Sequence, residues 1–161
     1  CLAAGVTDEA LRTALSTFPG VEHRLQKVGV HDGVTYSNDS KATNVDSVWY
    51  ALESMKRPTV WIAGGTDKGN DYTPLKEFAR RKVKALICMG VDNAKLKREF
   101  ADIVPVIRDC NTFEDAMAAA RDVATPGDTV LLSPACASWD MYANFEQRGR
   151  HFKQCINEML R

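Results

Sequence analysis

The polar string Asn-Asp-Ser-Lys-Ala-Thr-Asn at residues 38–44 has the side chains of an anion-binding site. It directly precedes apolar residues at helical spacing, so its hydroxyls and the ammonium of Lys41 would lie beside the free N–H groups of a helix start. Asp39 would then be available for a ribose hydroxyl or for orienting its neighbours. The same residue types are also common helix caps, and the string alone leaves both interpretations open.

A glycine-rich segment at residues 64–69, Gly-Gly-Thr-Asp-Lys-Gly, follows a continuous apolar run. It is not a P-loop, because Lys68 precedes its glycine and the sequence contains no G-K-[ST]; it also fails to match G-x-G-x-x-G. The spacing favours a strand-to-helix turn whose glycines adopt positive φ. In such a turn Lys68 can still meet a carboxylate ligand as a point charge.

Two further strings, at residues 133–138 and 144–149, precede and open the last predicted helix. The first, Ser-Pro-Ala-Cys-Ala-Ser, has small side chains that pack little and let a ligand approach the backbone. The second, Asn-Phe-Glu-Gln-Arg-Gly, is explained most simply by capping and a surface Glu–Arg pair worth about 0.3–0.5 kcal/mol. No histidine has metal-ligand spacing, His151 is an ordinary helix residue, and no Ser or Cys has an evident partner for nucleophilic catalysis.

The elements that must position these strings alternate along the chain. Two extended segments, 25–30 and 34–37, are joined by a turn around Asp32-Gly33. Asn44 caps one of the following helices, and Asn111 or Thr112 caps another. Apolar runs and amphipathic stretches predict strands at 59–63, 83–89, 104–107 and 129–132, and helices at 45–55, 73–81, 93–100, 112–124 and 146–160.

This alternation predicts an α/β, Rossmann-like fold with an open, mostly parallel sheet and helices on both faces. The polar strings follow predicted strands. Ligands of such sheets bind outside the carboxyl ends of the strands, so we expect the site at that edge.

Composition argues against several classes of protein. The 161 residues include 21 basic and 21 acidic ones, which leaves no surplus of cations for nucleic acid or a membrane surface. No apolar run approaches the ~20 residues that span a bilayer. The five cysteines form no C-x-x-C pair, which argues against zinc ribbons and thioredoxin-like motifs and favours reduced cytosolic thiols. The residues alone indicate an α/β domain that binds an anionic small molecule.

The first residues do not fit this domain. The chain opens with Cys-Leu-Ala-Ala rather than Met, in small apolar residues typical of a helix end, and another helix starts at Thr7 or Asp8. A helix of that size cannot bury its apolar face alone. We expect residues 1 to about 18 to be the end of an upstream domain.

Taken together, His23-Arg24, residues 38–44, and residues 131–140 with 144–149 closely resemble the C-terminal domain of the Mur ligases, and within that family the ligases that add D-glutamate. The spacing matches over essentially the whole chain. The resemblance implies an ATP-dependent acid–D-amino-acid ligase of peptidoglycan synthesis, a cytoplasmic enzyme of cell-wall biogenesis, cell shape and cell division. ATP phosphorylates the carboxylate of UDP-MurNAc-L-Ala, the amine of D-glutamate attacks the acyl phosphate, and ADP and phosphate leave.

The resemblance also implies a domain organisation. Residues 1–22 would be the tail and hinge of a central ATPase domain, and residues 23–161 the C-terminal ligase domain, which binds D-glutamate and closes over ATP. The partners would be D-glutamate, UDP-MurNAc-L-Ala and the enzyme's own N-terminal and central domains, without nucleic acid or membrane insertion. Because the central domain would supply the Mg²⁺ ligands, this chain is expected to hold no metal and to be inactive alone.

By position, the resemblance assigns catalytic roles near the ATP phosphates to Arg24 and Lys41. It places Asp39 at the nucleotide ribose or beside neighbours that it orients. One cation and several neutral donors would satisfy the two carboxylates of D-glutamate, and these are Thr43, Lys68, Ser138 and the backbone N–H of Phe145.

Two alternatives remain beside this assignment. One is the C-terminal domain of another Mur-type or folylpolyglutamate-type ligase that takes a different amino acid. The other is a stand-alone nucleotide- or amino-acid-binding module. A G-K-[ST] loop upstream in the parent reading frame would argue against the module.

Overall fold

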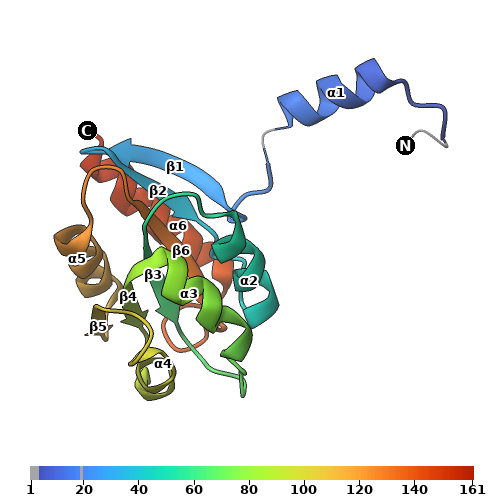
Figure 1. Cartoon of the computed structure of the whole chain (residues 1–161). Coiled ribbons are helices and arrows are strands. Elements are labelled where there is room, and N and C mark those ends of the chain that lie inside the picture. Colours follow the sequence, from blue (N-terminus) through green and yellow to red (C-terminus); the bar gives the residue numbers. More distant parts are fainter. Residues whose placement is uncertain (1–3, 19) are drawn as a thin grey trace.

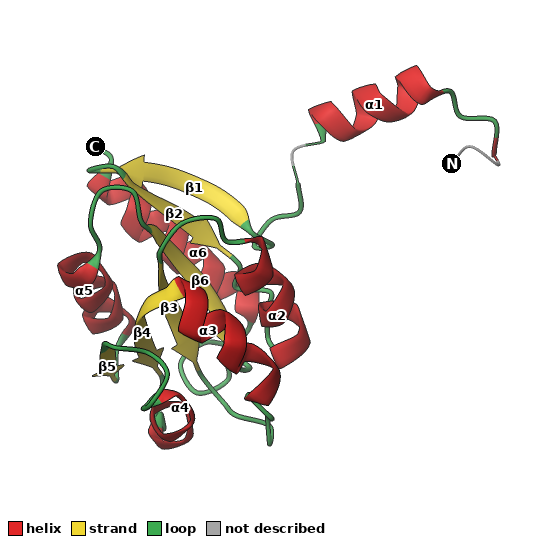
Figure 2. Cartoon of the chain, in the orientation of Figure 1, coloured by secondary structure: helices red, strands yellow, loops and turns green. Residues whose placement is uncertain are grey.

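The structure, a computed structural model, describes residues 4–18 and 20–161. Within these residues six strands form one sheet in the order β1-β2-β6-β3-β4-β5 (Figures 1 and 2). β1 is antiparallel to β2, and the other neighbouring strands are parallel, which confirms the predicted open, mostly parallel sheet. The strands are β1 (Gln26–His31), β2 (Val34–Asn38), β3 (Thr59–Gly64), β4 (Val83–Met89), β5 (Ile107–Cys110) and β6 (Thr129–Ala135).

Helices cover both faces of the sheet, as predicted. Successive side chains of a strand point to opposite faces, so Trp61 of β3 packs in one hydrophobic cluster and Ile62 in the other. α2, α3 and α4 bury their apolar residues in the first cluster, and α5 and α6 in the second. The helices of the described residues include α1 (Asp8–Thr17), α2 (Val45–Ser54), the 3₁₀ turn η2 (Thr73–Leu75), α3 (Lys76–Lys82), α4 (Ala94–Phe100), α5 (Phe113–Val123) and α6 (Phe145–Met159).

Local sequence signals act where they were expected. The Asn44 side chain accepts a hydrogen bond from the Ser47 N–H at 2.8 Å, and Thr112, rather than Asn111, caps α5. Asp32 and Gly33 join β1 to β2 with φ of 49° and 77°. Two consecutive positive φ values give the turn the twist that a two-residue hairpin requires.

The predicted strand at 104–107 is wrong in position. Pairing with β4 begins only at Ile107, and β5 runs to Cys110. Pro105 has no N–H to donate to a strand ladder, so the apolar run that contains it cannot pair as a regular strand. Val104 instead ends the turn after α4, where its N–H donates to the Phe100 carbonyl at 3.0 Å and its side chain is buried.

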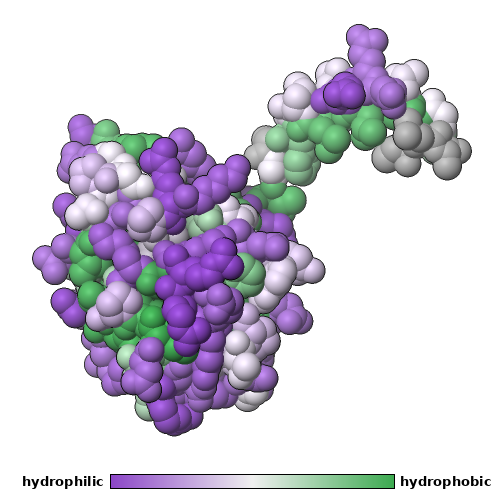
Figure 3. Space-filling model, in the orientation of Figure 1, coloured by the Kyte–Doolittle hydropathy of each residue, from purple (hydrophilic) through white to green (hydrophobic). Residues whose placement is uncertain are grey.

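α1 confirms the helix predicted from Thr7, whose side chain caps it. None of its residues is buried, and Figure 1 shows it apart from the sheet and the other helices. Leu15 and Phe18 are 70% and 62% exposed, and Figure 3 shows hydrophobic residues gathered along one side of α1. Residues 1–3, where the end of another helix was expected, lie outside the described residues.

The cysteines of the described residues are free thiols. Cys88 is fully buried in the core beside β3, as expected for a small apolar side chain, and burial raises its pKa to about 12. Cys1 lies outside the described residues. None of the described helices has the length and hydropathy to cross a membrane.

Candidate ligand-binding site

Three loops meet at the carboxyl ends of the central strands. Because β6 lies between β2 and β3, the loops after these three strands are neighbours although they are far apart in the sequence. We call them the β2 loop (39–44), the β3 loop (65–72) and the β6 loop (136–144). The polar strings of the sequence lie in these loops, at the ends of the strands that precede them or at the start of α6, so they meet at the predicted edge of the sheet.

The β2 loop is fastened to β6 by main-chain and side-chain bonds. The Asp39 N–H donates to the Leu132 carbonyl at 2.8 Å, and the Ala135 N–H donates to the Ala42 carbonyl at 3.0 Å. The Ser133 hydroxyl donates to Asp39 Oδ2 at 2.7 Å. These bonds fix the backbone that carries Lys41 and Thr43.

Asp39 is 2% exposed, and both of its oxygens are used within the chain. Oδ2 accepts from Ser133, and Oδ1 accepts from the Leu25 N–H at 3.1 Å. Burial raises its pKa to about 6, although both hydrogen bonds and the charge of Arg24 favour the ionised form. Of the two roles expected for Asp39, these contacts support the orienting one, because they fix the backbone next to Arg24.

Lys41 and Phe145 lie together at the start of α6. The Lys41 ammonium is 4.6 Å from the centroid of the Phe145 ring, and the Lys41 N–H donates to the His23 carbonyl at 3.1 Å. As the first residue of α6, Phe145 has an N–H with no acceptor inside the helix. Arg24 follows His23 and is exposed.

His23 is buried between β2 and α6. Asn38 Nδ2 lies 3.0 Å from His23 Nδ1 and also donates to the Gly149 carbonyl at 3.0 Å. A Cβ on Gly149 would lie 2.2 Å from His23 Nδ1, so only glycine allows this approach. Desolvation lowers the pKa of His23. The buried ring therefore holds the main chain next to Arg24 against α6.

Arg148 is the site residue that sequence reasoning placed wrongly. It was expected in a surface pair with a glutamate, but it is 1% exposed. Its Nε donates to the Ser40 hydroxyl oxygen at 3.1 Å, and one terminal nitrogen donates to the carbonyls of Ser40 and Cys136 at 3.0 and 3.3 Å. The Ser40 hydroxyl in turn donates to the Phe145 carbonyl at 2.7 Å. Burial lowers the pKa of Arg148 to about 10. Arg148 thus joins the β2 loop to the β6 loop.

The helical spacing of the sequence does indicate that Arg148 is buried. It precedes Phe152 by one turn and Ile156 by two, and both are fully buried on the sheet-facing side of α6. Residues four apart on a helix lie on the same face, so the guanidinium had to point toward the sheet.

The β3 and β6 loops form a second cluster. Thr66 and Ala137 exchange main-chain hydrogen bonds of 2.9 and 3.2 Å, which form an isolated antiparallel bridge. Gly65 has φ of 123°, and a Cβ there would lie 2.2 Å from the Ala137 carbonyl oxygen. The Lys68 ammonium lies 6.0 Å from the centroid of the exposed Trp139 ring.

The expectation that residues 133–138 pack little is wrong, because every one of them is buried. Their small side chains let the β2, β3 and β6 loops approach one another closely. Ser138 is 3% exposed, and its carbonyl accepts from the N–H groups of Met141 and Tyr142 at 3.1 and 2.8 Å.

The predicted site residues therefore fall into two groups at one edge of the sheet. Asp39 contacts Leu25, Lys41 contacts Phe145 at the start of α6, and Lys68 lies beside the loop of Ser138. Thr43 is half-buried directly before the cap of α2, where its N–H donates to the Lys41 carbonyl at 2.9 Å. A common pocket for one ligand stays a prediction. Among residues 4–18 and 20–161, no group of three or more His, Cys, Asp or Glu is placed to hold a metal ion.

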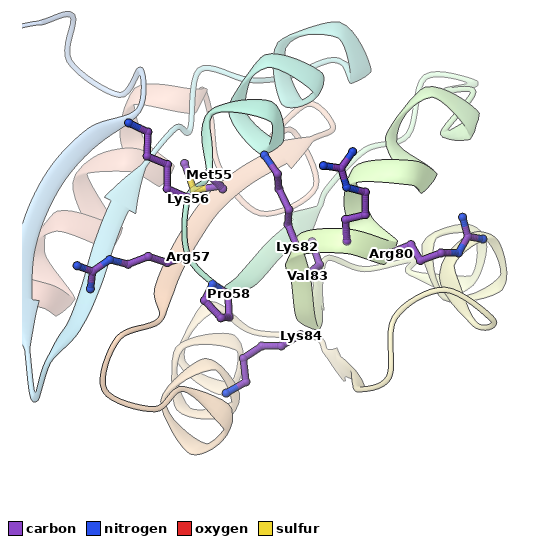
Figure 4. A pocket seen from close by; sticks show the side chains of 9 residues that line it. Met55, Lys56, Arg57, Pro58, Arg80, Lys82, Val83 and Lys84 are labelled. Atoms are coloured by element: carbon purple, nitrogen blue, oxygen red, sulfur yellow. The ribbon is translucent and has the colours of Figure 1, made fainter.

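A basic hollow lies at the other end of the sheet. Its volume is about 450 Å³, and it is lined by residues 55–58 and 80–84, which lead into the amino ends of β3 and β4. Figure 4 shows its basic side chains fanning out from one another. Lys84 pairs with Asp128 at 2.8 Å, and Lys82 donates to the Leu52 carbonyl at 2.9 Å. The lining includes none of the predicted site residues, so this hollow is not the candidate site.

Comparison with known proteins identifies relatives over nearly the whole chain. The family model described as "Mur ligase, glutamate ligase domain" matches residues 23–136. The UDP-N-acetylmuramoylalanine–D-glutamate ligase of Salinibacter ruber is 51% identical over 155 residues, which are 96% of this chain and 34% of that protein. The protein of the same name from Bacteroides fragilis is 50% identical over 157 residues, 97% of this chain and 35% of that protein. The chain thus spans about a third of the length of these relatives.

Solved structures give the same fold. MurF from Acinetobacter baumannii has a TM-score of 0.65 at 14% identity, over 95% of this chain and 35% of that one. The UDP-N-acetylmuramate-alanine ligase MurC from Thermotoga maritima has a TM-score of 0.62 at 13% identity, over 97% of this chain and 35% of that one. Such low identities show the fold alone, but the family model covers most of the chain. This chain belongs to the Mur ligase family and includes its glutamate ligase domain.

Proposed function

We propose that the chain is the C-terminal domain of a UDP-N-acetylmuramoylalanine–D-glutamate ligase of peptidoglycan synthesis. The observation that carries the proposal is an identity of about 50% to ligases of that name over 96–97% of the chain. In this proposal residues 1–22 are the end and hinge of a preceding ATPase domain. The exposed apolar side of α1 supports that part, because a helix with no buried residue needs another surface to pack on.

The β3 and β6 loops would bind D-glutamate together with the start of α6. The ligand loses water from two carboxylates, and fixed donors must replace that water. Lys68 offers an exposed ammonium that forms no ion pair with the described residues. Thr43 and Ser138 offer hydroxyls, and Phe145 offers an N–H at a helix start, where the dipole favours anions.

ATP would lie at Arg24 and Lys41. When bound with Mg²⁺ held by the central domain, it supplies the phosphoryl group that activates the carboxylate of UDP-MurNAc-L-Ala. Arg24 and Lys41 are cations beside the hinge and can approach its phosphates when the domains close. Arg24 and Lys41 are suited to binding phosphates because both side chains lie outside the buried core. Neither belongs to an ion pair of the described residues. Asp39 keeps the backbone next to Arg24 in place through the Leu25 N–H.

A chimera tests the proposal. The matching third of the Salinibacter ruber ligase would be replaced by this chain, and D-glutamate-dependent phosphate release and product formation would be measured. We expect activity with UDP-MurNAc-L-Ala. Lys68→Ala should raise the D-glutamate KM by about tenfold or more, the effect of one lost charged hydrogen bond, and leave the ATP KM unchanged. Ser138→Ala should act in the same direction more mildly.

Lys56→Ala is the matched control, because Lys56 is an exposed lysine in the hollow at the opposite end of the sheet. Its kinetics should equal those of the unchanged chimera. Unaltered D-glutamate kinetics in both Lys68→Ala and Ser138→Ala would contradict the proposed pocket. A preference for L-glutamate would favour the folylpolyglutamate-type alternative.

A further inference from the structure

The carboxylate of Asp67 is the centre of a group of hydrogen bonds next to Lys68. Oδ1 accepts from the N–H groups of Gly69 and Asn70 at 2.7 and 2.9 Å, and Oδ2 accepts from the Tyr72 hydroxyl at 2.8 Å. The Lys95 ammonium of α4 lies 3.4 Å from Oδ1. We call these five residues the Asp67 clamp. Its carboxylate thus receives four donors, two from its own turn and two from outside it.

The clamp rests on buried structure. Tyr72 is 1% exposed and packs edge-on against Phe100, with 5.9 Å between ring centroids. Its hydroxyl also lies 3.2 Å from the sulfur of buried Cys136. Lys95 stands over the Tyr72 ring, with its ammonium 5.5 Å from the centroid. Through Tyr72, Asp67 is therefore bonded to a group that cannot move without disturbing the core.

The same loop is tied at two points to the end of β6 and to the loop of Ser138 that follows it. Thr66, directly before Asp67, forms the bridge to Ala137. Asn70, directly after the turn, donates from Nδ2 to the Ala135 carbonyl at 3.0 Å. The clamp and these two ties fix the chain on both sides of Lys68, while the Lys68 side chain itself stays exposed.

Hydrogen bonds keep Asp67 ionised. Partial burial opposes its charge, but the bonds from Asn70, Tyr72 and Gly69 and the ammonium of Lys95 outweigh that effect and lower the pKa of Asp67. The carboxylate thus accepts all four bonds at neutral pH. Lys95 pairs with its charge, and Asp67 forms no ion pair with Lys68 among the described residues.

These contacts bear on the proposed pocket, and the inference rests on the proposed function. When the backbone of a turn is already fixed, ligand binding does not have to order it, so more of the attraction between its lysine and a carboxylate appears as affinity. We propose that Asp67 is a positioning residue, which acts through the turn of residues 67–70 to hold the Lys68 main chain at a fixed distance from Ser138, so that the Lys68 ammonium and Ser138 can meet the two carboxylates of D-glutamate. Asp67 itself does not touch the ligand.

The test uses Asp67 variants in the chimera. Asp67→Ala removes the acceptor for all four donors. It should raise the D-glutamate KM by about tenfold, because the contact between Lys68 and a carboxylate of D-glutamate would be largely lost, and it should leave the ATP KM unchanged. Asp67→Asn keeps an acceptor oxygen for Gly69 and Asn70 but loses the charge toward Lys95, so its rise should be smaller. Asp71→Ala is the control, because Asp71 is an exposed carboxylate of the same loop that caps only the Thr73 N–H, at 2.9 Å. Its kinetics should not change.

A double-mutant cycle with Lys68 separates positioning from general damage. If Asp67 acts through Lys68, Asp67→Ala should raise the D-glutamate KM no further in a chimera that already carries Lys68→Ala. A further rise there, or equal rises in the KM of ATP and D-glutamate, would mean that Asp67 only supports the fold. No rise in Asp67→Ala, when Lys68→Ala does raise the KM, would also overturn the inference. No rise in Lys68→Ala itself would instead contradict the proposed pocket.

Discussion

Two aspartates in the site loops show how burial and donors together set the ionisation of a carboxyl group. Asp39 is 2% exposed and accepts two hydrogen bonds within the chain, and burial raises its pKa to about 6. Asp67 is 24% exposed with four donors, and its pKa is lowered because these bonds outweigh its burial. Ionisation of an aspartate can thus be unfavourable in one loop, where burial dominates, and favourable in the next, where hydrogen bonds dominate.

Asp39→Asn should change how stability depends on pH. Because the pKa of Asp39 in the folded chain, about 6, lies above the ordinary value of 3.8 for an aspartate, the folded chain takes up this proton at a higher pH than the unfolded chain. Lowering the pH from 7 to 4 therefore removes a cost on the order of 2–3 kcal/mol. Asparagine resembles the protonated form, so the variant should gain free energy of unfolding relative to the unchanged chain at pH 7 and lose most of that gain at pH 4.

Urea unfolding of the chain at both pH values measures this difference. Asp102→Asn, an exposed aspartate after α4, serves as the control and should show a similar difference at both pH values. If Asp39→Asn does the same, ionised Asp39 does not carry this cost.

At the residue scale, the sequence reveals which side chains gather but not how deep they lie. The strings predicted that Asp39 and Lys41 belong to one polar site, and the structure places both in the β2 loop. One of the two hydrogen bonds that Asp39 accepts comes from Ser133, which is 94 residues away in the sequence. No local spacing reports such a contact, because it follows from the pairing of β2 with β6.

At the scale of elements, α6 brings a cation into the interior to join two loops. Arg148→Lys should lower the free energy of unfolding by on the order of 2–3 kcal/mol, because an ammonium cannot reach the Ser40 and Cys136 carbonyls and the Ser40 hydroxyl at once. Arg150→Lys, two residues later on the exposed side of α6, should leave stability nearly unchanged. Equal stabilities of the two variants in urea unfolding would show that the fork of the guanidinium is not what holds the loops.

The junction of β3 with its loop depends on glycine. Gly65→Ala would add both backbone strain, at φ of 123°, and a Cβ 2.2 Å from the Ala137 carbonyl oxygen. Gly127→Ala would add strain alone, because φ is 100° and no atom lies within 4 Å of the added Cβ. We expect Gly65→Ala to cost more by on the order of 1–3 kcal/mol, the usual range for overpacking. Thermal unfolding of both variants decides, and equal costs would contradict a steric role of Gly65.

The elements themselves were largely predictable, since their signals are local. Asn44 and Thr112 cap helices where they were expected, and the continuously apolar runs of β3, β4 and β6 are buried strands. The prediction of a strand at 104–107 was wrong because it rested on an apolar run that contains Pro105. Proline has no N–H for the strand ladder, and β5 begins only at Ile107.

At the scale of the whole molecule, the strand order determines which loops become neighbours. The last strand, β6, lies between β2 and β3, so residues from the beginning and end of the chain form one edge. Alternating strands and helices predict a parallel sheet, but they do not predict this order, because several orders satisfy the same local pattern. The expectation that residues of these three loops act together came from the resemblance to a family, because the alternation of strands and helices alone does not predict it.

The whole-molecule prediction concerns the chain by itself. Buried clusters on both faces of the sheet give it a core of its own, so the purified chain should unfold cooperatively. It should nevertheless show no D-glutamate-dependent phosphate release with ATP, Mg²⁺ and UDP-MurNAc-L-Ala. The sequence has no G-K-[ST] loop to hold the phosphates, and in phosphoryl transfer catalysis comes almost entirely from positioning and from the charges of metal and loop. The chimera described above is the positive control, since it adds the upstream domains of a relative to the same residues. Phosphate release by the isolated chain that rises with D-glutamate would mean that this domain carries the ATP chemistry itself, and the division of labour proposed between the domains would be wrong.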